Sequence, residues 1–153
     1  MTRRPRLAAA AAALVAAAAL SACTPAEVAV WYGRAELHTT PSEAAGGFWC
    51  ARFVDRVESE AHVPGWVSES GPGELYRDHA DRLSQTPHVG DLVFVDLSHG
   101  TQPGAPVTHV GIVQAPLGGG RVLTIEGNAD DSNTVIEHVR QTGDGYVVAY
   151  ARP

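Results

Sequence analysis

Three residues of this 153-residue chain carry the side chains that covalent acyl transfer requires: Cys50, His109 and Glu126. In such chemistry a cysteine is the nucleophile, a histidine accepts its proton or holds it as an ion pair, and a carboxylate or amide orients the histidine. Asn128, two residues after Glu126, is a further candidate for the orienting role. We therefore predict a catalytic site made of Cys50, His109, Glu126 and Asn128.

Cys50 is predicted to stand in the first turn of a helix. Apolar residues recur there at a four-residue spacing, which places on one buried helix face Trp49, Phe53, Val57 and Ala61. In a first turn, unpaired backbone N–H groups and the helix dipole favour a thiolate. Positions of this kind lower the pKa of a cysteine from about 8.5 to about 3.5–7.5.

His109 and Glu126 belong to a predicted hairpin of two strands, 107–114 and 122–125, joined by a glycine-rich loop over 115–120. Side chains alternate along a strand, so His109 shares a face with Gly111, and Glu126 shares a face with Thr124. If the loop is centred between residues 117 and 118, the register pairs His109 with Glu126, Gly111 with Thr124, and Val113 with Val122. A loop of uneven length would shift this register.

The remaining elements predict an α+β domain. Besides the helix that begins at Cys50, we expect a first helix over 26–37 and a weaker one over 74–83. Further strands are expected over 92–97, 135–140 and 146–151. Helices followed by an antiparallel sheet are typical of the α+β class. The chain length allows a single domain with one core.

Residues 1–22 are predicted to be an export signal of the lipoprotein type. Three arginines precede an apolar run over 7–20, which is short for a membrane span. The segment Leu20-Ser21-Ala22-Cys23 resembles a bacterial lipobox, which implies cleavage before Cys23 and lipidation of its thiol. We expect an exported protein anchored at the outer face of the cytoplasmic membrane, in the cell envelope. Ordinary cleavage near Ala22 would instead make it a secreted protein.

Charge and cysteine content restrict the partners. The chain has no lysine, and three of its eleven basic residues lie in the signal, so eight arginines remain against seventeen acidic residues. This acidic balance argues against nucleic acid as a partner. A disulfide between Cys23 and Cys50 is disfavoured, because it would consume the nucleophile. Zinc held by Cys50 and His109 lacks the further ligands of a structural site, so no metal or other cofactor is predicted.

Taken in order, the segments around these residues resemble the CHAP family, the cysteine- and histidine-dependent amidohydrolase/peptidases of bacterial cell walls. The resemblance runs from about Glu27 to Pro153 and rests on the segments 49–54, 90–96, 108–113, 124–128 and 148–153. It implies a papain-like (CHAP/NlpC-type) catalytic domain over 26–153. NlpC-like wall peptidases usually show Asp-Cys-Ser at the nucleophile and a third histidine, whereas this chain has Trp-Cys-Ala and Glu126.

The resemblance also implies the activity. We expect a peptidoglycan hydrolase that cuts an amide of the stem peptide or cross-bridge through an acyl-enzyme, either an N-acetylmuramoyl-L-alanine amidase or a peptidoglycan endopeptidase. The alternative is a catalytically silent wall-binding or regulatory lipoprotein. Because no Gln or Asn precedes Gln85, the oxyanion is expected to meet the Cys50 backbone N–H, with Thr40 or Ser42 as helpers. The loop before Cys50 contains only Glu43 as an acidic residue, so no calcium is expected there.

Overall fold

The computed structural model describes residues 23–42, 44, 49–68, 71–98, 107–129 and 133–153. Within these ranges the chain forms helices α2 (Pro25–Ala35), α3 (Cys50–Glu60) and α4 (Pro72–Asp78). The strands are β1 (Leu83–Ser84), β2 (Leu92–Val95), β3 (His109–Gly118), β4 (Arg121–Gly127), β5 (Val135–Gln141) and β6 (Val147–Ala151). The predicted α+β class is confirmed, whereas the predicted export signal lies outside the described residues.

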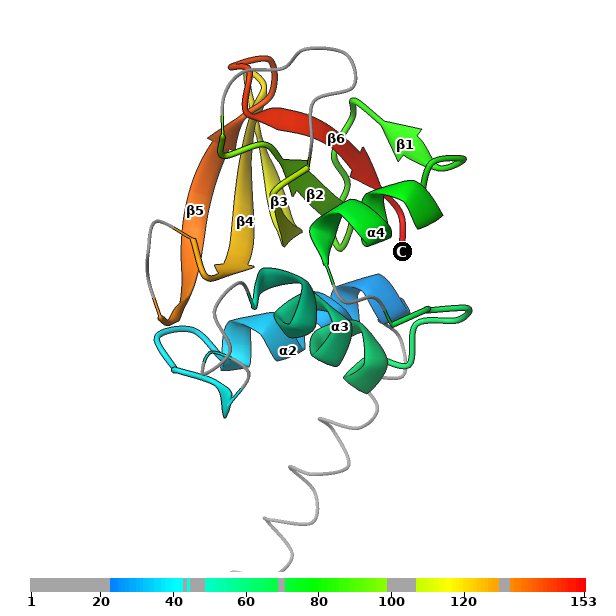
Figure 1. The fold of residues 1–153 in the computed structure, drawn as a ribbon, viewed down its shortest axis with the longest axis vertical. Coiled ribbons are helices and arrows are strands. Elements are labelled where there is room, and N and C mark those ends of the chain that lie inside the picture. Colours follow the sequence, from blue (N-terminus) through cyan, green and yellow to red (C-terminus); the bar gives the residue numbers. More distant parts are fainter. Residues whose placement is uncertain (1–22, 43, 45–48, 69–70, 99–106, 130–132) are drawn as a thin grey trace, which may run out of the picture.

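The strands form one antiparallel sheet in the order β1-β6-β2-β3-β4-β5 (Figure 1). Every residue of the central strand β2 is buried, because apolar side chains pack against both faces of the sheet. One face carries Val110, Ile112 and Ile125 into the core shared with the helices. The other face carries a smaller cluster around Val113 and Val122. By alternation, His109, Gly111 and Glu126 belong to this second face.

The first helix begins with a capping box. The Thr24 hydroxyl accepts a hydrogen bond from the Glu27 N–H, and the Glu27 carboxylate accepts one from the Thr24 N–H at 2.8 Å. Proline at the first helical position suits this start. Helix α4 is shorter than predicted and ends at Asp78, because residues 83 and 84 pair with β6 as a strand.

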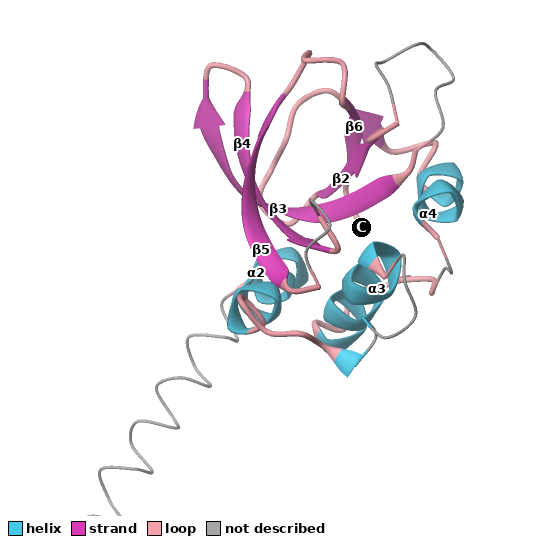
Figure 2. Cartoon of the chain, turned by 60° about the vertical axis from the view of Figure 1, so that its left-hand side comes forward, coloured by secondary structure: helices cyan, strands magenta, loops and turns pink. Residues whose placement is uncertain are grey.

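Helix α3 presents the predicted apolar stripe to the core. Trp49, Phe53, Val57 and Ala61 are all buried. The helix contacts α2 and α4 and packs against β3 and β4 (Figures 1 and 2). Among the described residues, no helix is long and apolar enough to cross a membrane.

The register of the β3–β4 hairpin differs from the prediction by two residues. Val113 pairs with Thr124 and not with Val122, so Gly111 and not His109 comes opposite Glu126. The strands extend through most of the expected loop as far as Gly118, and two irregularities shift the pairing, between residues 113 and 115 and between 116 and 118. Because the error is an even number of residues, every side chain stays on its predicted face.

Candidate active site

Cys50 is the first residue of α3, as predicted, and it is 1% exposed. Trp49 precedes it as the N-cap and forms no side-chain cap, so the first-turn N–H groups are left for other acceptors. The Trp49 ring lies against Gly127, at the end of β4. A Cβ atom at Gly127 would come within 2.3 Å of that ring. This close contact fixes the start of α3, and hence Cys50, beside the end of β4.

His109 is the first residue of β3 and lies between Cys50 and Glu126. Its Nε2 is 2.8 Å from Oε2 of Glu126, and both side chains are almost wholly buried. The imidazole also interacts with the Cys50 thiol, and each group shifts the pKa of the other. Because Nε2 meets the carboxylate, Nδ1 is the ring nitrogen available to the thiol, and in such an arrangement a histidine shuttles a proton in a fixed orientation.

Glu126 reaches His109 diagonally across the hairpin, because Gly111 has no side chain. A Cβ atom at Gly111 would lie 2.6 Å from Cγ of Glu126. Diagonal neighbours in a sheet are about 7–8 Å apart, a span that two long side chains can bridge. The missing side chain at Gly111 thus makes room for the contact that the predicted register had assigned to directly opposed residues.

Two further residues hold Glu126 in place. Arg140 of β5 donates from Nε to Oε1 at 2.9 Å and from Nη2 to Oε2 at 2.6 Å. The Thr124 hydroxyl lies 2.6 Å from Oε1 and 3.0 Å from the carbonyl oxygen of His138, either of which can accept its proton. Neither residue was predicted from the sequence as part of the site. A signal existed only for Thr124, which shares a strand face with Glu126, since the position of Arg140 depends on how β5 pairs with β4.

The electrostatics of Cys50 and His109 favour a thiolate–imidazolium pair. Burial opposes ionisation of the thiol, but the hydrogen bond and positive charge of His109, with the backbone N–H groups of Val110 and Ala51, outweigh it and lower the pKa of Cys50. Burial also opposes charging of the imidazole. Hydrogen bonds from His109 to Cys50 and Glu126, and the negative charges of both, nevertheless raise the pKa of His109 to about 9.

Glu126 stays ionised although it is fully buried. Burial alone would raise the pKa of its carboxyl, but the hydrogen bonds and charges of His109 and Arg140 hold that pKa well below its usual range. Cys50, His109, Glu126 and Arg140 thus form a row of alternating negative and positive charges.

Three residues considered in the sequence analysis lie outside this row. Strand β4 ends at Gly127, and Asn128 follows with φ 62°, in the left-handed region that asparagine tolerates. Strand alternation therefore no longer carries Asn128 onto the face of Glu126, and Asn128 forms no hydrogen bond with His109. Thr40 and Ser42 are exposed, so the structure does not bring either of them to the buried thiol.

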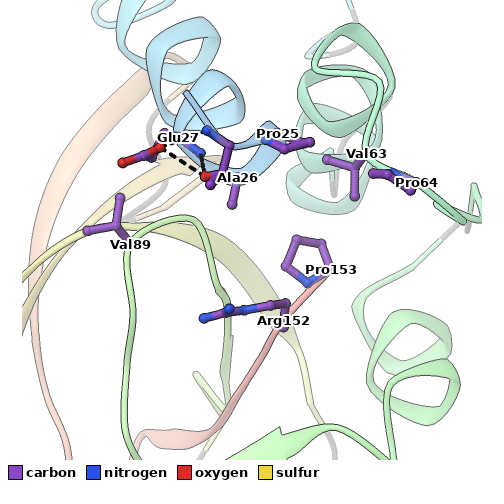
Figure 3. A pocket seen from close by; sticks show the side chains of 9 residues that line it. Pro25, Ala26, Glu27, Val63, Pro64, Val89, Arg152 and Pro153 are labelled. Atoms are coloured by element: carbon purple, nitrogen blue, oxygen red, sulfur yellow. Dashed lines mark hydrogen bonds between the residues drawn. The ribbon is translucent and has the colours of Figure 1, made fainter. Parts of the chain in front are cut away.

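The described hollows lie around α2 and not at this row. Figure 3 shows a hollow of about 370 Å³ between the start of α2 and the C-terminal residues Arg152 and Pro153. Another hollow, of about 580 Å³, is lined by Cys23 and Trp31. Cys23 is exposed, and both cysteines are free. Within the described ranges, no three His, Cys, Asp or Glu side chains are grouped so that they could hold a metal ion.

Helix α3 also carries a buried acid, Glu58. Neither of its carboxyl oxygens has a hydrogen-bond partner in the described part of the chain, and its side chain is 0% exposed. Burial raises the pKa of Glu58 to about 8, so the group is largely protonated at neutral pH. The periodicity of α3 did not reveal this residue as a core position.

An α+β domain with a cysteine at a helix start, followed by a histidine and a carboxylate on the sheet, is the papain-like class. The family model of the CHAP domain matches residues 42–128. Since this match covers more than half of the chain and includes Cys50, His109 and Glu126, the protein belongs to the CHAP family, as the resemblance implied. A comparison with curated proteins found no match.

Solved structures support the fold. The crystal structure of Ly7917 superposes with a TM-score of 0.57 at 20% identity, covering 85% of this chain. The crystal structure of Ly7917 with the hydrolyzing product of MDP has the same TM-score at 22% identity and covers 86% of this chain. In both cases this chain spans 63% of the length of the other protein.

Proposed function

We propose that this protein is a peptidoglycan hydrolase that cleaves an amide bond of the cell-wall peptide with Cys50 as the nucleophile. The observation that carries the proposal is the buried row in which His109 is hydrogen-bonded to Glu126 and interacts with Cys50, whose pKa it lowers. Membership of the CHAP family supports this chemistry. MDP denotes muramyl dipeptide, a peptidoglycan fragment, so the structurally similar Ly7917 complex supports the class of substrate.

The reaction follows from the charges of the row. The Cys50 thiolate attacks the amide carbonyl carbon, and the oxyanion that forms accepts hydrogen bonds from N–H groups at the start of α3. The His109 imidazolium gives its proton to the departing amine as the C–N bond breaks. A water molecule then attacks the carbonyl carbon of the thioester while His109 removes a proton from that water. The C–S bond breaks, which regenerates the Cys50 thiolate and releases the carboxylic acid product. Glu126 stabilises the imidazolium both before acylation and again when His109 takes the proton of the water.

The type of bond is tested by digesting peptidoglycan with the purified protein and identifying the muropeptides by mass spectrometry. An amidase releases the whole stem peptide from the muramic acid. An endopeptidase leaves L-alanine attached to the sugar and creates a new amino group within the peptide or cross-bridge. We expect one of these patterns from the wild type and neither from Cys50→Ala or His109→Ala. Turnover near the wild-type rate by either folded variant would exclude the proposal.

The state of Cys50 is tested separately from turnover. Alkylation by iodoacetamide, quantified on the peptide that contains Cys50, should proceed well below the pH range of an ordinary thiol, because the pKa of Cys50 is lowered. Hydrolysis should then decline above about pH 9, where His109 loses the proton that the leaving amine needs. A silent wall-binding protein would show neither the hydrolysis nor its alkaline limit.

A further inference from the structure

Arg140 is a buried arginine that the proposed reaction does not itself use. It lies in β5, it is 7% exposed, and both hydrogen bonds described above run to Glu126. Its backbone pairs with Val122, four residues before Glu126 along β4. The guanidinium therefore reaches along the sheet to meet the carboxylate at both oxygens, the bidentate geometry that arginine provides and lysine does not.

We propose that Arg140 is a positioning residue of this site: it keeps Glu126 ionised and correctly oriented, so that His109 and Cys50 remain an imidazolium–thiolate pair. The inference rests on the proposed function, because it assigns a role to that ion pair. Arg140 donates to both oxygens of Glu126, and it acts on the thiol and the imidazole through that carboxylate.

The charge balance of the row requires a second cation. With Arg140 present, two buried anions, Cys50 and Glu126, face two cations, His109 and Arg140. Without Arg140 the row carries a net negative charge in a buried environment, and binding one more proton becomes favourable. That proton ends on Cys50, which removes the nucleophile, or on Glu126, which removes the anion that supports His109.

The hydrogen bonds of Glu126 show that Arg140 also fixes the orientation of the carboxylate. Oε2 of Glu126 faces both His109 and Nη2 of Arg140, while Oε1 faces Nε of Arg140 and the hydroxyl of Thr124. Thr124 can hold one oxygen, but it brings no charge. Arg140 binds both oxygens at once and so prevents the carboxylate from rotating away from His109.

The experiment measures the rate of Cys50 alkylation by iodoacetamide against pH, which needs no substrate. Arg140→Gln keeps a hydrogen-bond donor and removes the charge. We expect the acid limb of its profile, the pH range in which protonation of Cys50 slows labelling, to move up by at least one pH unit. At any pH on the acid limbs of both proteins, labelling should then be at least about tenfold slower than in the wild type. Arg140→Lys keeps the positive charge but loses the bidentate guanidinium geometry. Its acid limb should therefore move by less than half as much as that of Arg140→Gln.

Two controls isolate the effect. Arg121→Gln changes an exposed arginine on the neighbouring strand β4 and should leave the acid limb unmoved. Arg140 from β5 and His109 from β3 contact the Glu126 carboxylate, and Cys50 from α3 interacts with His109. His138 lies on the face of β5 that carries Arg140. Each arginine variant is also made together with His138→Gln, so that the side chain of His138 cannot produce the shift.

A purely structural role makes a different prediction. It would lower the melting temperature and leave the acid limb of Arg140→Gln at its wild-type position, which would overturn the inference. If Arg140→Gln does not fold, Glu126→Gln is compared with the double variant Glu126→Gln/Arg140→Gln, in which both buried charges are gone. Equal acid limbs support the inference, because Arg140 no longer has the Glu126 carboxylate to act through, and a further shift overturns it.

The inference and the proposed function fail in different ways. If wild-type Cys50 is alkylated only in the pH range of an ordinary thiol, the assignment of Cys50 as the nucleophile is wrong. If wild-type Cys50 labels at low pH and Arg140→Gln behaves identically, only the role of Arg140 is wrong.

Discussion

Replacing Gly111 with alanine should disable the site from its centre. The new Cβ would lie 2.6 Å from Cγ of Glu126 and 3.0 Å from the carbonyl oxygen of Ile125, whereas ordinary contacts begin near 3.4 Å. Glu126 must therefore retreat by about 0.8 Å, the difference between 2.6 and 3.4 Å. It cannot do so freely, because Arg140 and His109 hold its two oxygens at 2.6 to 2.9 Å.

The expected effect has two components. Overpacking a tight core typically costs about 1–3 kcal/mol, which lowers the melting temperature of a domain of this size by about 4–12 °C. A displacement near 1 Å within a catalytic group can cost about 100-fold in rate. We therefore expect Gly111→Ala to lower kcat about 10- to 100-fold with a smaller change in KM, because Glu126 supports His109 and does not touch the substrate.

The assay is steady-state hydrolysis of a purified muropeptide, well below the melting temperature of each variant, with circular dichroism to establish the folded fraction. Gly73→Ala is the matched control. It lies in α4, its nearest neighbouring atom would be 3.7 Å from the new Cβ, and alanine favours a helix. A folded Gly111→Ala variant with the wild-type kcat, or an equal loss of kcat in Gly73→Ala, would refute the claim that Glu126 needs the room left by Gly111 to support His109.

Three further predictions concern separate parts of the molecule. Glu126→Gln should lower kcat at least about tenfold and have little further effect in a His109→Ala background, since residues that act as one unit are not additive; full additivity in kinetic assays of the four variants would contradict this. Glu58 has a pKa raised from 4.5 to about 8, so its neutral carboxyl stabilises the fold fully below pH 4.5 and this stability is lost as pH rises toward about 8. The stability of Glu58→Gln relative to the wild type should therefore increase from pH 5 to pH 9, by about 4 kcal/mol at most. Denaturation curves at both pH values measure this difference in unfolding free energy, and an equal difference at pH 5 and pH 9 would exclude the prediction. Cys23→Ala should release the protein from the membrane fraction and alter its processing, and unchanged fractionation would favour secretion as a soluble protein.

The local elements of the fold could be predicted from the sequence because their signals are local. The apolar spacing around Cys50 depends on helix geometry alone, and all four residues of the stripe are buried. The period of two in the hairpin placed His109 and Glu126 on the same face, and the mistaken register did not change that face. The family resemblance then supplied the roles of these residues.

The details that complete the site depend on contacts between elements distant in sequence. The bulges of β3 set the register, and they leave Gly111 opposite Glu126. The pairing of β5 with β4 brings Arg140 to the carboxylate, and no periodic pattern in β5 distinguishes that arginine from an exposed one.

The sequence by itself therefore determined the types of the candidate site residues, the helix that begins at Cys50 and the sheet face that carries His109. Only the tertiary structure decided that Asn128 leaves the strand, that Arg140 balances Glu126 and that Glu58 is buried with no hydrogen-bond partner among the described residues. The physical reason is that backbone periodicity acts over a few neighbouring residues, whereas burial and charge balance depend on every element that packs around a group.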